Sequence, residues 1–224
     1  MKRLIIFLFT IMLFAYAQES LNTIVVRGEG VIEQEADLAI VQLGVSLQDR
    51  TADKAYKEVN RIVNEIIKAV SRVGIKKEDI KTASIGLYPQ YEFPEGTQRL
   101  IGYQMYHNLS LRVRDIRKLA DVIDFATVAG ANTISSISFG FQDPAKLESQ
   151  ARVMAINDAT QKAQAIAKAT NLNLGRIVQI IEDLPSKREL PYYVGAGGPD
   201  GNEIMQGANI IKVAVTITYE IINK

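Results

Sequence analysis

Alternating apolar and polar residues near the start of the chain predict two strands. Residues 21–33 are rich in β-branched side chains, and apolar and polar positions alternate through residues 38–48. The alternation slips at Ile40 and Val41, which predicts a β-bulge there. Both segments should therefore belong to a sheet with one buried face.

The hydrophobic period changes to that of an α-helix after Thr51. Apolar residues then recur three and four positions apart, with charged residues on the opposite face. We expect the Thr51 hydroxyl group to cap the first turn and Gly74 to end the helix with a positive φ. Residues 80–91 and 99–114 follow as the two strands of a hairpin, because the segment between them contains proline and glycine.

The second part of the chain shows similar signals. Asp143 should cap a third helix that has Pro144 at its first position. Alanines four positions apart give this helix a stripe of methyl groups, which predicts close packing against a sheet or a helix, or alternatively a subunit interface. The stripe consists of Ala151, Ala155, Ala159 and Ala163. The elements expected here are helices at 115–129 and 144–169 and strands at 134–141, 174–182 and 208–222.

This order of elements predicts an α+β fold, with a largely antiparallel sheet covered by three helices. Two loosely similar strand–helix–strand–strand halves are expected at 38–114 and 134–222, joined by the helix between them. They should form one compact unit or two closely packed halves.

The first 17 residues have the layout of a secretory signal peptide. Lys2 and Arg3 precede an apolar run, and the small residues Ala15 and Ala17 predict cleavage after Ala17. The run is short for a membrane span, which needs about 20 residues, and an uncleaved anchor is the alternative. We therefore predict that residues 18–224 form the mature domain, in the periplasm of a two-membrane bacterium.

Charge and cysteine content narrow the choice of partners. The chain has no cysteine and a net charge of +1, which becomes −1 once Lys2 and Arg3 are removed. Binding of nucleic acid normally requires a basic excess, so nucleic acid is not an expected partner. No second long apolar run follows the first, so we expect no transmembrane segment in the mature chain.

Gly28 and Gly30 resemble part of a nucleotide-binding turn. A dinucleotide fingerprint would place a third glycine where Glu33 stands, at the mouth of a helix, but a strand is predicted to follow. The two glycines therefore indicate a bulge or a close crossing of strands. Glu33, Glu35 and Asp37 are expected to be solvated turn residues, with a cation site as the alternative.

The chain offers few groups for catalysis or metal binding. His107 is the only histidine, and without cysteine it cannot form a typical zinc or copper site. Asp121 and Asp124 are three apart on a predicted helix, which is common for solvated carboxylates. We therefore expect no catalytic residues, no cofactor and no metal, and hence not an enzyme. A hydrolase that uses His107 or carboxylates, and a carrier of a small apolar ligand, are the alternatives.

Two groups of aromatic and apolar residues are candidates for binding. Residues 185–207 predict a flexible loop, which would be a surface loop or an interaction site. The candidate interaction residues of this loop are Tyr192, Tyr193, Val194, Ile204 and Met205. An aromatic cluster on the predicted hairpin indicates cross-strand packing, or alternatively a ligand groove. It consists of Tyr88, Tyr91, Phe93, Tyr103 and Tyr106.

Several short motifs together resemble the SIMPL-domain (DUF541) family, over about residues 24–219. They are the glycine pair Gly28 and Gly30, the helix start at Thr51, the Asp79-Ile80-x-Thr82 segment, the stretch ending at Asn108, Gly130-Ala131-Asn132, and the alanine-rich helix. The family includes periplasmic antigens and oxidative-stress defence proteins of bacteria. The sequence departs from the family pattern at residues 35–37, where Glu-Ala-Asp replaces the more usual Pro-Asp.

The resemblance implies an exported α+β protein with no assigned catalytic residues and no cofactor. It also implies a link to oxidative stress and envelope protection, and a tendency to form homo-oligomers. The residues and the resemblance together predict a non-catalytic envelope protein that acts through self-assembly or by binding an envelope protein.

Overall fold

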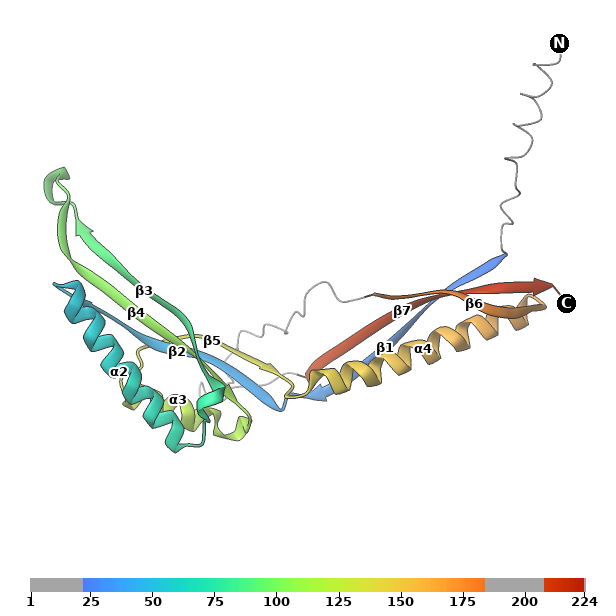
Figure 1. Cartoon of the computed structure of the whole chain (residues 1–224), viewed down its shortest axis with the longest axis horizontal. Helices are drawn as coiled ribbons and strands as arrows, with labels where there is room; N and C mark the ends of the chain where they lie inside the picture. The colour runs from blue at the N-terminus through green and yellow to red at the C-terminus, as the bar shows by residue number, and fades with distance from the viewer. Residues whose placement is uncertain (1–21, 184–207, 224) are drawn as a thin grey trace, which may run out of the picture. The chain divides into compact units, whose positions relative to one another are not determined.

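A computed structural model describes residues 22–183 and 208–223 (Figure 1). The predicted signal peptide and the predicted loop at 185–207 lie outside these residues. The described residues form two compact units. Unit 1 contains residues 22–31, 149–183 and 212–223, and unit 2 contains residues 32–148 and 208–211.

The strands and long helices expected from periodicity are present in the described residues, with ends close to those expected. The strands are β1 (Thr23–Glu35), β2 (Leu38–Asp49), β3 (Ile80–Glu92), β4 (Arg99–Val113), β5 (Thr133–Gly140), β6 (Leu172–Asp183) and β7 (Ala208–Asn223). The helices are α2 (Ala52–Arg72), α3 (Leu119–Val128) and α4 (Pro144–Ala169), with short 3₁₀ helices η1 (Lys77–Asp79), η2 (Pro94–Gly96) and η3 (Ile116–Lys118). The α+β class is confirmed.

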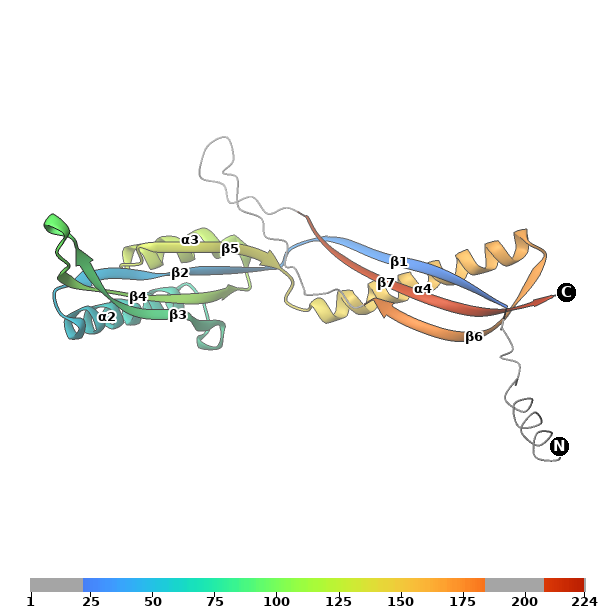
Figure 2. The same ribbon diagram turned by 90° about the horizontal axis from the view of Figure 1, so that it is seen from above.

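Unit 1 is a three-stranded antiparallel sheet in the order β1-β7-β6, with α4 along one face (Figures 1 and 2). The first and last strands of the chain are therefore neighbours. Just before the start of β1 and near the end of β7, the backbone N–H of Ile221 donates to the carbonyl oxygen of Asn22 at 2.8 Å. The apolar side chains of β7 that face α4 include Val213, Val215 and Ile217, which are all buried.

The alanine stripe of α4 packs directly against β1, as one of the two alternatives predicted. Its four alanines are completely buried. Gly28 and Gly30 lie opposite, and a methyl group added to either would overlap the α4 backbone, at Ala155 and Ala151 respectively. The glycines therefore permit close contact between a strand and a helix, which is a use of glycine that follows from its missing Cβ.

Unit 2 is a four-stranded antiparallel sheet in the order β3-β4-β2-β5, with α2 and α3 packed on one face (Figure 1). Its core joins the inner side chains of the sheet to the apolar faces of both helices. The completely buried members include Val41, Leu43, Val59, Ile66, Leu111 and Val122. Gly74 ends α2 with φ +102°, as predicted.

Two local expectations differ from the structure, and a third is confirmed. β2 pairs with β4 without a register shift from Ala39 to Asp49, so no bulge lies at Ile40 and Val41; its pairing with β5 shifts between Gln42 and Leu43, where Ser135 of β5 is the extra residue. Thr51 occupies the N-cap position of α2, but its hydroxyl group makes no capping hydrogen bond, and its backbone N–H donates to the Asp49 carboxylate at 3.0 Å. Asp143 does cap α4, by accepting from the backbone N–H of Lys146 at 3.1 Å.

The division of the chain also falls in a different place from the expected halves. β5 pairs with β2 in the sheet of unit 2, whereas β6, β7 and most of α4 belong to unit 1. The expected half at 134–222 is thus shared between the units. The pattern of side chains fixes which face of a strand is buried, but it does not fix which strand lies beside it.

Candidate interaction surface

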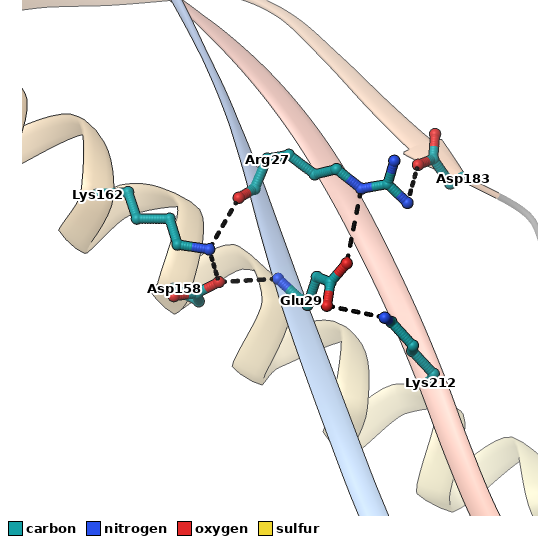
Figure 3. Close-up of polar contacts among 6 residues, drawn as sticks. All are labelled: Arg27, Glu29, Asp158, Lys162, Asp183 and Lys212. Carbon is teal, nitrogen blue, oxygen red and sulfur yellow. Dashed lines mark hydrogen bonds and ion pairs between the residues drawn. The ribbon is translucent and has the colours of Figure 1, made fainter.

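The outer edge of β1 is covered by side chains from α4 (Figure 3). The Asp158 carboxylate accepts a hydrogen bond from the backbone N–H of Glu29 at 2.9 Å, and the Lys162 ammonium donates to the backbone carbonyl of Arg27 at 3.1 Å. Lys162 and Asp158 also pair with each other at 2.7 Å. Two backbone groups in the middle of β1 that a second strand could use are therefore already bonded.

Charged side chains cover the face of β1 that points away from α4 (Figure 3). Glu29 pairs with Lys212 of β7 at 2.8 Å, and Arg27 pairs with Asp183 at the end of β6 at 3.1 Å. The hydrogen bond from Lys212 lowers the pKa of Glu29. This group of ion pairs links the three strands, and its exposure to solvent means that its main effect is on solubility and alignment rather than stability.

The opposite edge of the same sheet, along β6, is different. Its outward side chains are aliphatic and exposed: Ile177 is 49% exposed, Val178 43%, Ile180 57% and Ile181 46%. Within residues 22–183 and 208–223, no side chain bonds the backbone groups on the outer side of β6. An exposed aliphatic edge with available N–H and C=O groups is a typical template for pairing with another strand.

Irregularities in β6 limit how a second strand could pair there. The register with β7 shifts between Leu174 and Ile177 and again between Ile177 and Gln179. From Gln179 to Asp183 the pairing is regular. Because bulges bend and twist a strand, we expect β6 to accept a partner in a restricted geometry rather than support open-ended growth of a sheet.

The two edges of the unit 2 sheet are less suitable for strand pairing. β3 contains Pro89, which has no N–H to donate, and its register with β4 shifts twice. β5 is shorter and carries three serines, and the hydroxyl group of Ser135 bonds the Gln42 carbonyl at 3.4 Å. β6 also has two register shifts, but it contains no proline and carries more exposed aliphatic side chains than β5.

The β3–β4 hairpin supplies a second apolar surface, on unit 2. Tyr88 and Tyr106 stack across the strands with ring centroids 5.9 Å apart, as expected for cross-strand packing. Towards the turn, Tyr91 is 45% exposed and Phe93 66%, so these rings are only partly packed.

His107 lies between α2 and β3 and contacts neutral side chains. Its Nε2 is 3.1 Å from the Thr82 hydroxyl oxygen, and its Nδ1 is 3.3 Å from the Asn60 side-chain oxygen. Burial lowers the pKa of the His107 imidazole, which favours the neutral form. These contacts hold the ring in place, and they do not supply the carboxylate that would orient it as a general base.

The carboxylates considered from the sequence are dispersed. Asp121 and Asp124 are exposed on α3, and Glu33 and Glu35 are exposed at the end of β1. Asp37 holds a turn, because its carboxylate accepts from the backbone N–H of Gln142 at 2.7 Å. Over the part of the chain that the structure describes, no three acidic, histidine or cysteine side chains come together as a metal site would require.

The interaction residues predicted in the loop lie outside the described residues. These are Tyr192, Tyr193, Val194, Ile204 and Met205. The sequence points to exposed sheet edges in general but does not single out β6, although it contains the run Ile177-Val178-Gln179-Ile180-Ile181. A run of aliphatic residues places apolar side chains on both faces of a strand, but it does not tell whether the strand is central or at an edge. Only the sheet order shows that β6 is an edge strand.

Comparison with known proteins identifies the family. The family model for SIMPL, a protein of unknown function (DUF541), matches residues 24–219. The chain belongs to the SIMPL family. The match includes both units and therefore confirms the resemblance drawn from the short motifs.

Two relatives illustrate what members of the family are called. A 26 kDa periplasmic immunogenic protein from Brucella melitensis is 30% identical over 224 residues, which cover 92% of this chain and 90% of that protein. The uncharacterized protein YggE of Escherichia coli K12 is 27% identical over 197 residues, which cover 88% of this chain and 76% of that protein. Neither name refers to an enzymatic activity. In the described part of this SIMPL chain, none of the helices has the length and apolar character needed to span a bilayer.

Proposed function

We propose that this SIMPL protein is a non-catalytic protein of the periplasm that acts by assembling with further copies of itself through β6. The exposed aliphatic edge of β6 carries the proposal, because the other edge of the same sheet is covered by α4. A sheet with one covered edge and one available edge can add one neighbour on one side only.

The sequence of β6 is complementary to itself, which favours a second copy of the chain as the partner. Residues 176–182 read Arg-Ile-Val-Gln-Ile-Ile-Glu, with a basic residue at one end and an acidic residue at the other. In an antiparallel pair of two β6 strands centred on Gln179, opposite charges and aliphatic residues would face each other. The pairs would be Arg176 with Glu182, Ile177 with Ile181, Val178 with Ile180, and Gln179 with its own copy, and this register requires the irregular segment before Gln179 to straighten on pairing.

The charges at the ends of β6 already have partners within their own chain. Arg176 lies 3.3 Å from Glu220, and Glu182 lies 2.8 Å from Arg152. Contacts with a second copy would therefore add to existing pairs instead of neutralising isolated charges. For this reason the aliphatic residues should contribute most of the association energy, and the charges should set the register.

Sedimentation velocity of residues 18–224 over a range of concentrations tests the assembly. We expect a dimer or a larger species that dissociates on dilution. Ile180→Lys places a charge at the centre of the paired edge and should shift the protein towards the monomer. Val25→Lys is the matched control, because Val25 is a β-branched residue, 62% exposed, on the covered edge strand β1.

A wild-type protein that remains monomeric at the highest attainable concentration would contradict self-assembly. Equal dissociation of both lysine variants would contradict the role of β6 in particular. Far-UV circular dichroism of each variant separates loss of association from loss of folding.

Export is a separate part of the proposal. It is supported by the layout of residues 1–17 and by the word periplasmic in the name of the Brucella relative. Intact mass of the protein recovered from the periplasmic fraction should correspond to a chain that begins at Gln18. Recovery of a chain that still begins at Met1, in the membrane fraction, would support the uncleaved anchor instead. For a non-catalytic protein of the periplasm, any link to oxidative stress would be indirect, through the state of the envelope.

A further inference from the structure

A cavity of about 190 Å³ lies in unit 2, where the end of α2 meets η1 and the end of β4. It has room for about six water molecules, so it suits a small ion or a single headgroup rather than a large ligand. Most of the side chains in its wall are charged. The charged members are Lys76, Asp79, Arg112, Arg114, Asp115 and Lys118.

Both carboxylates in the wall are already neutralised. Asp79 is only 3% exposed and accepts two hydrogen bonds of 2.8 Å from the guanidinium of Arg114. The hydrogen bonds from Arg114 hold the pKa of Asp79 below its usual range. Asp115 accepts from the guanidinium of Arg117 at 2.9 and 3.1 Å. The positive charges that remain in the wall therefore have little compensation from these two groups.

Arg112 is the group that most needs a partner. Its Nε–H is buried, and no acceptor within the described residues lies in hydrogen-bonding position. A buried donor without an acceptor is unfavourable, and more so when it belongs to a charged group. Arg112 also lies close enough to Asp79 to contribute to the lowered pKa of that carboxyl, which places it beside the Asp79–Arg114 pair.

Lys118 and Lys76 add charge to the same cavity. The ammonium of Lys118 is 3.5 Å from the carbonyl oxygen of Val73, and that of Lys76 is 3.8 Å from the Glu78 carboxylate. Both contacts are long for a hydrogen bond of a charged donor, which is normally about 2.7–2.9 Å. Either side chain could therefore turn towards an anion at small cost.

The C-terminus of α2 does not cancel the positive charge of the cavity wall. A helix C-terminus carries partial negative charge, which would weaken anion binding. Here the backbone N–H groups of Gly74 and Ile75 donate to the carbonyls of Ser71 and Val70 at 3.1 Å each, in a Schellman arrangement. The Lys118 ammonium lies 3.5 Å from the carbonyl oxygen of Val73, the C-cap residue. The cavity thus keeps an excess of positive charge.

We propose that this cavity binds a phosphate group, with Arg112 and Lys118 as its main donors. A guanidinium matches two phosphate oxygens at once, and the Arg112 guanidinium forms no hydrogen bond or ion pair with the described residues that a phosphate would have to displace. Free phosphate and the headgroup of an anionic lipid share this chemistry. The proposal does not depend on self-assembly, since β6 belongs to the other unit.

Calorimetric titration of the mature chain with inorganic phosphate, at constant ionic strength, tests the first source. Flotation with vesicles that contain phosphatidic acid tests the second. Arg112→Gln should weaken binding about tenfold or more, because it removes a charge-assisted contact. Lys118→Gln, at an exposed position, provides a second variant that does not disturb the buried wall. Arg99→Gln is the control, since Arg99 lies on the same strand, pairs with Glu92 and lies outside the cavity wall.

A site for free phosphate is supported if inorganic phosphate binds saturably, if both cavity variants weaken this binding, and if Arg99→Gln leaves the dissociation constant within twofold of the wild type. The same dependence with vesicles alone supports a site for a lipid phosphate. Absence of binding to both probes, or equal weakening by all three variants, overturns the proposal.

Discussion

Replacing Gly28 by alanine tests the packing that holds unit 1 together. A Cβ at this position would overlap the backbone of α4 at Ala155 and lie 2.8 Å from the Cβ of Ala159. Carbon atoms in contact normally lie about 3.5–4.0 Å apart, so β1 or α4 must move by about 1 Å. The neighbouring atoms belong mainly to helix backbone, which cannot turn aside as a long side chain could.

We expect Gly28→Ala to lower the free energy of unfolding by about 2–3 kcal/mol. Overpacking of this kind costs about 1–3 kcal/mol, and the backbone clash puts Gly28 at the upper end. The alanine regains at most about 0.4–1 kcal/mol by restricting the unfolded chain. Gly175→Ala on β6 is the matched control, because its Cβ would lie 3.0 Å from the Cβ and 3.2 Å from the backbone oxygen of Glu220, a far milder approach than that at Gly28. That variant should stay within about 1 kcal/mol of the wild type.

Urea unfolding followed by circular dichroism gives the change in stability, and hydrogen exchange assigns it to one unit. Amides of β1, β7 and α4 should exchange faster in Gly28→Ala, whereas those of α2 and β4 should not. A Gly28→Ala protein as stable as the wild type would refute the close packing. Equal loss in Gly175→Ala would show that the effect does not arise from the contact with α4.

Three further variants or titrations test other contacts. Asp158→Ala should increase hydrogen exchange at the Glu29 amide, since the carboxylate accepts from it at 2.9 Å, while unchanged exchange would contradict the covered edge of β1. Asp79→Asn should cost about 2 kcal/mol, reduced because Arg114 is 43% exposed. Because folding lowers the pKa of the Asp79 carboxyl, the ionised side chain contributes fully to folding stability above pH 3.8, its usual pKa. This contribution is lost as the pH falls through the lower pKa of the folded protein. In an NMR titration, the His107 imidazole should have a midpoint below pH 6.5, because burial lowers its pKa. Its neutral form therefore contributes fully to folding stability above pH 6.5, and this contribution falls as the pH drops through the lower folded pKa. A midpoint above pH 6.5 would contradict the burial of the ring.

Much of the fold follows from local patterns in the sequence. The alternation in β2 and β4, the amphipathic face of α2 and the Asp143 cap of α4 depend on residues close together in the chain. The alanine stripe correctly predicted close packing of α4. These features are set by side-chain period and by capping geometry, both of which can be recognised from sequence.

Strand order could not be predicted in the same way. β1 lies beside β7, from the opposite end of the chain, and β5 joins the sheet of β2. A period of two indicates which side chains are buried, but many strands have compatible faces. The partner of the alanine stripe, Gly28 and Gly30, therefore emerges only from the structure: the sequence predicts a bulge or a close crossing of strands there, and the structure shows close contact with α4 instead.

The candidate surfaces depended on tertiary structure even more. Exposure of Ile180 and Ile181 follows from the position of β6 at an edge. The cavity in unit 2 brings Arg112 and Lys118 together with Lys76, more than thirty residues earlier in the chain. No short motif marks either surface.

A single cysteine at position 179 tests the proposed assembly most directly. The chain has no cysteine of its own, and in the proposed register Gln179 lies opposite its own copy. Opposed residues of antiparallel strands have Cα atoms about 4.5–5.5 Å apart, which lies within the range for a disulfide. Gln179→Cys should therefore form a covalent dimer rapidly under mild oxidation, whereas Val25→Cys on the covered strand should not. Equal, slow cross-linking of both variants would contradict self-assembly through β6.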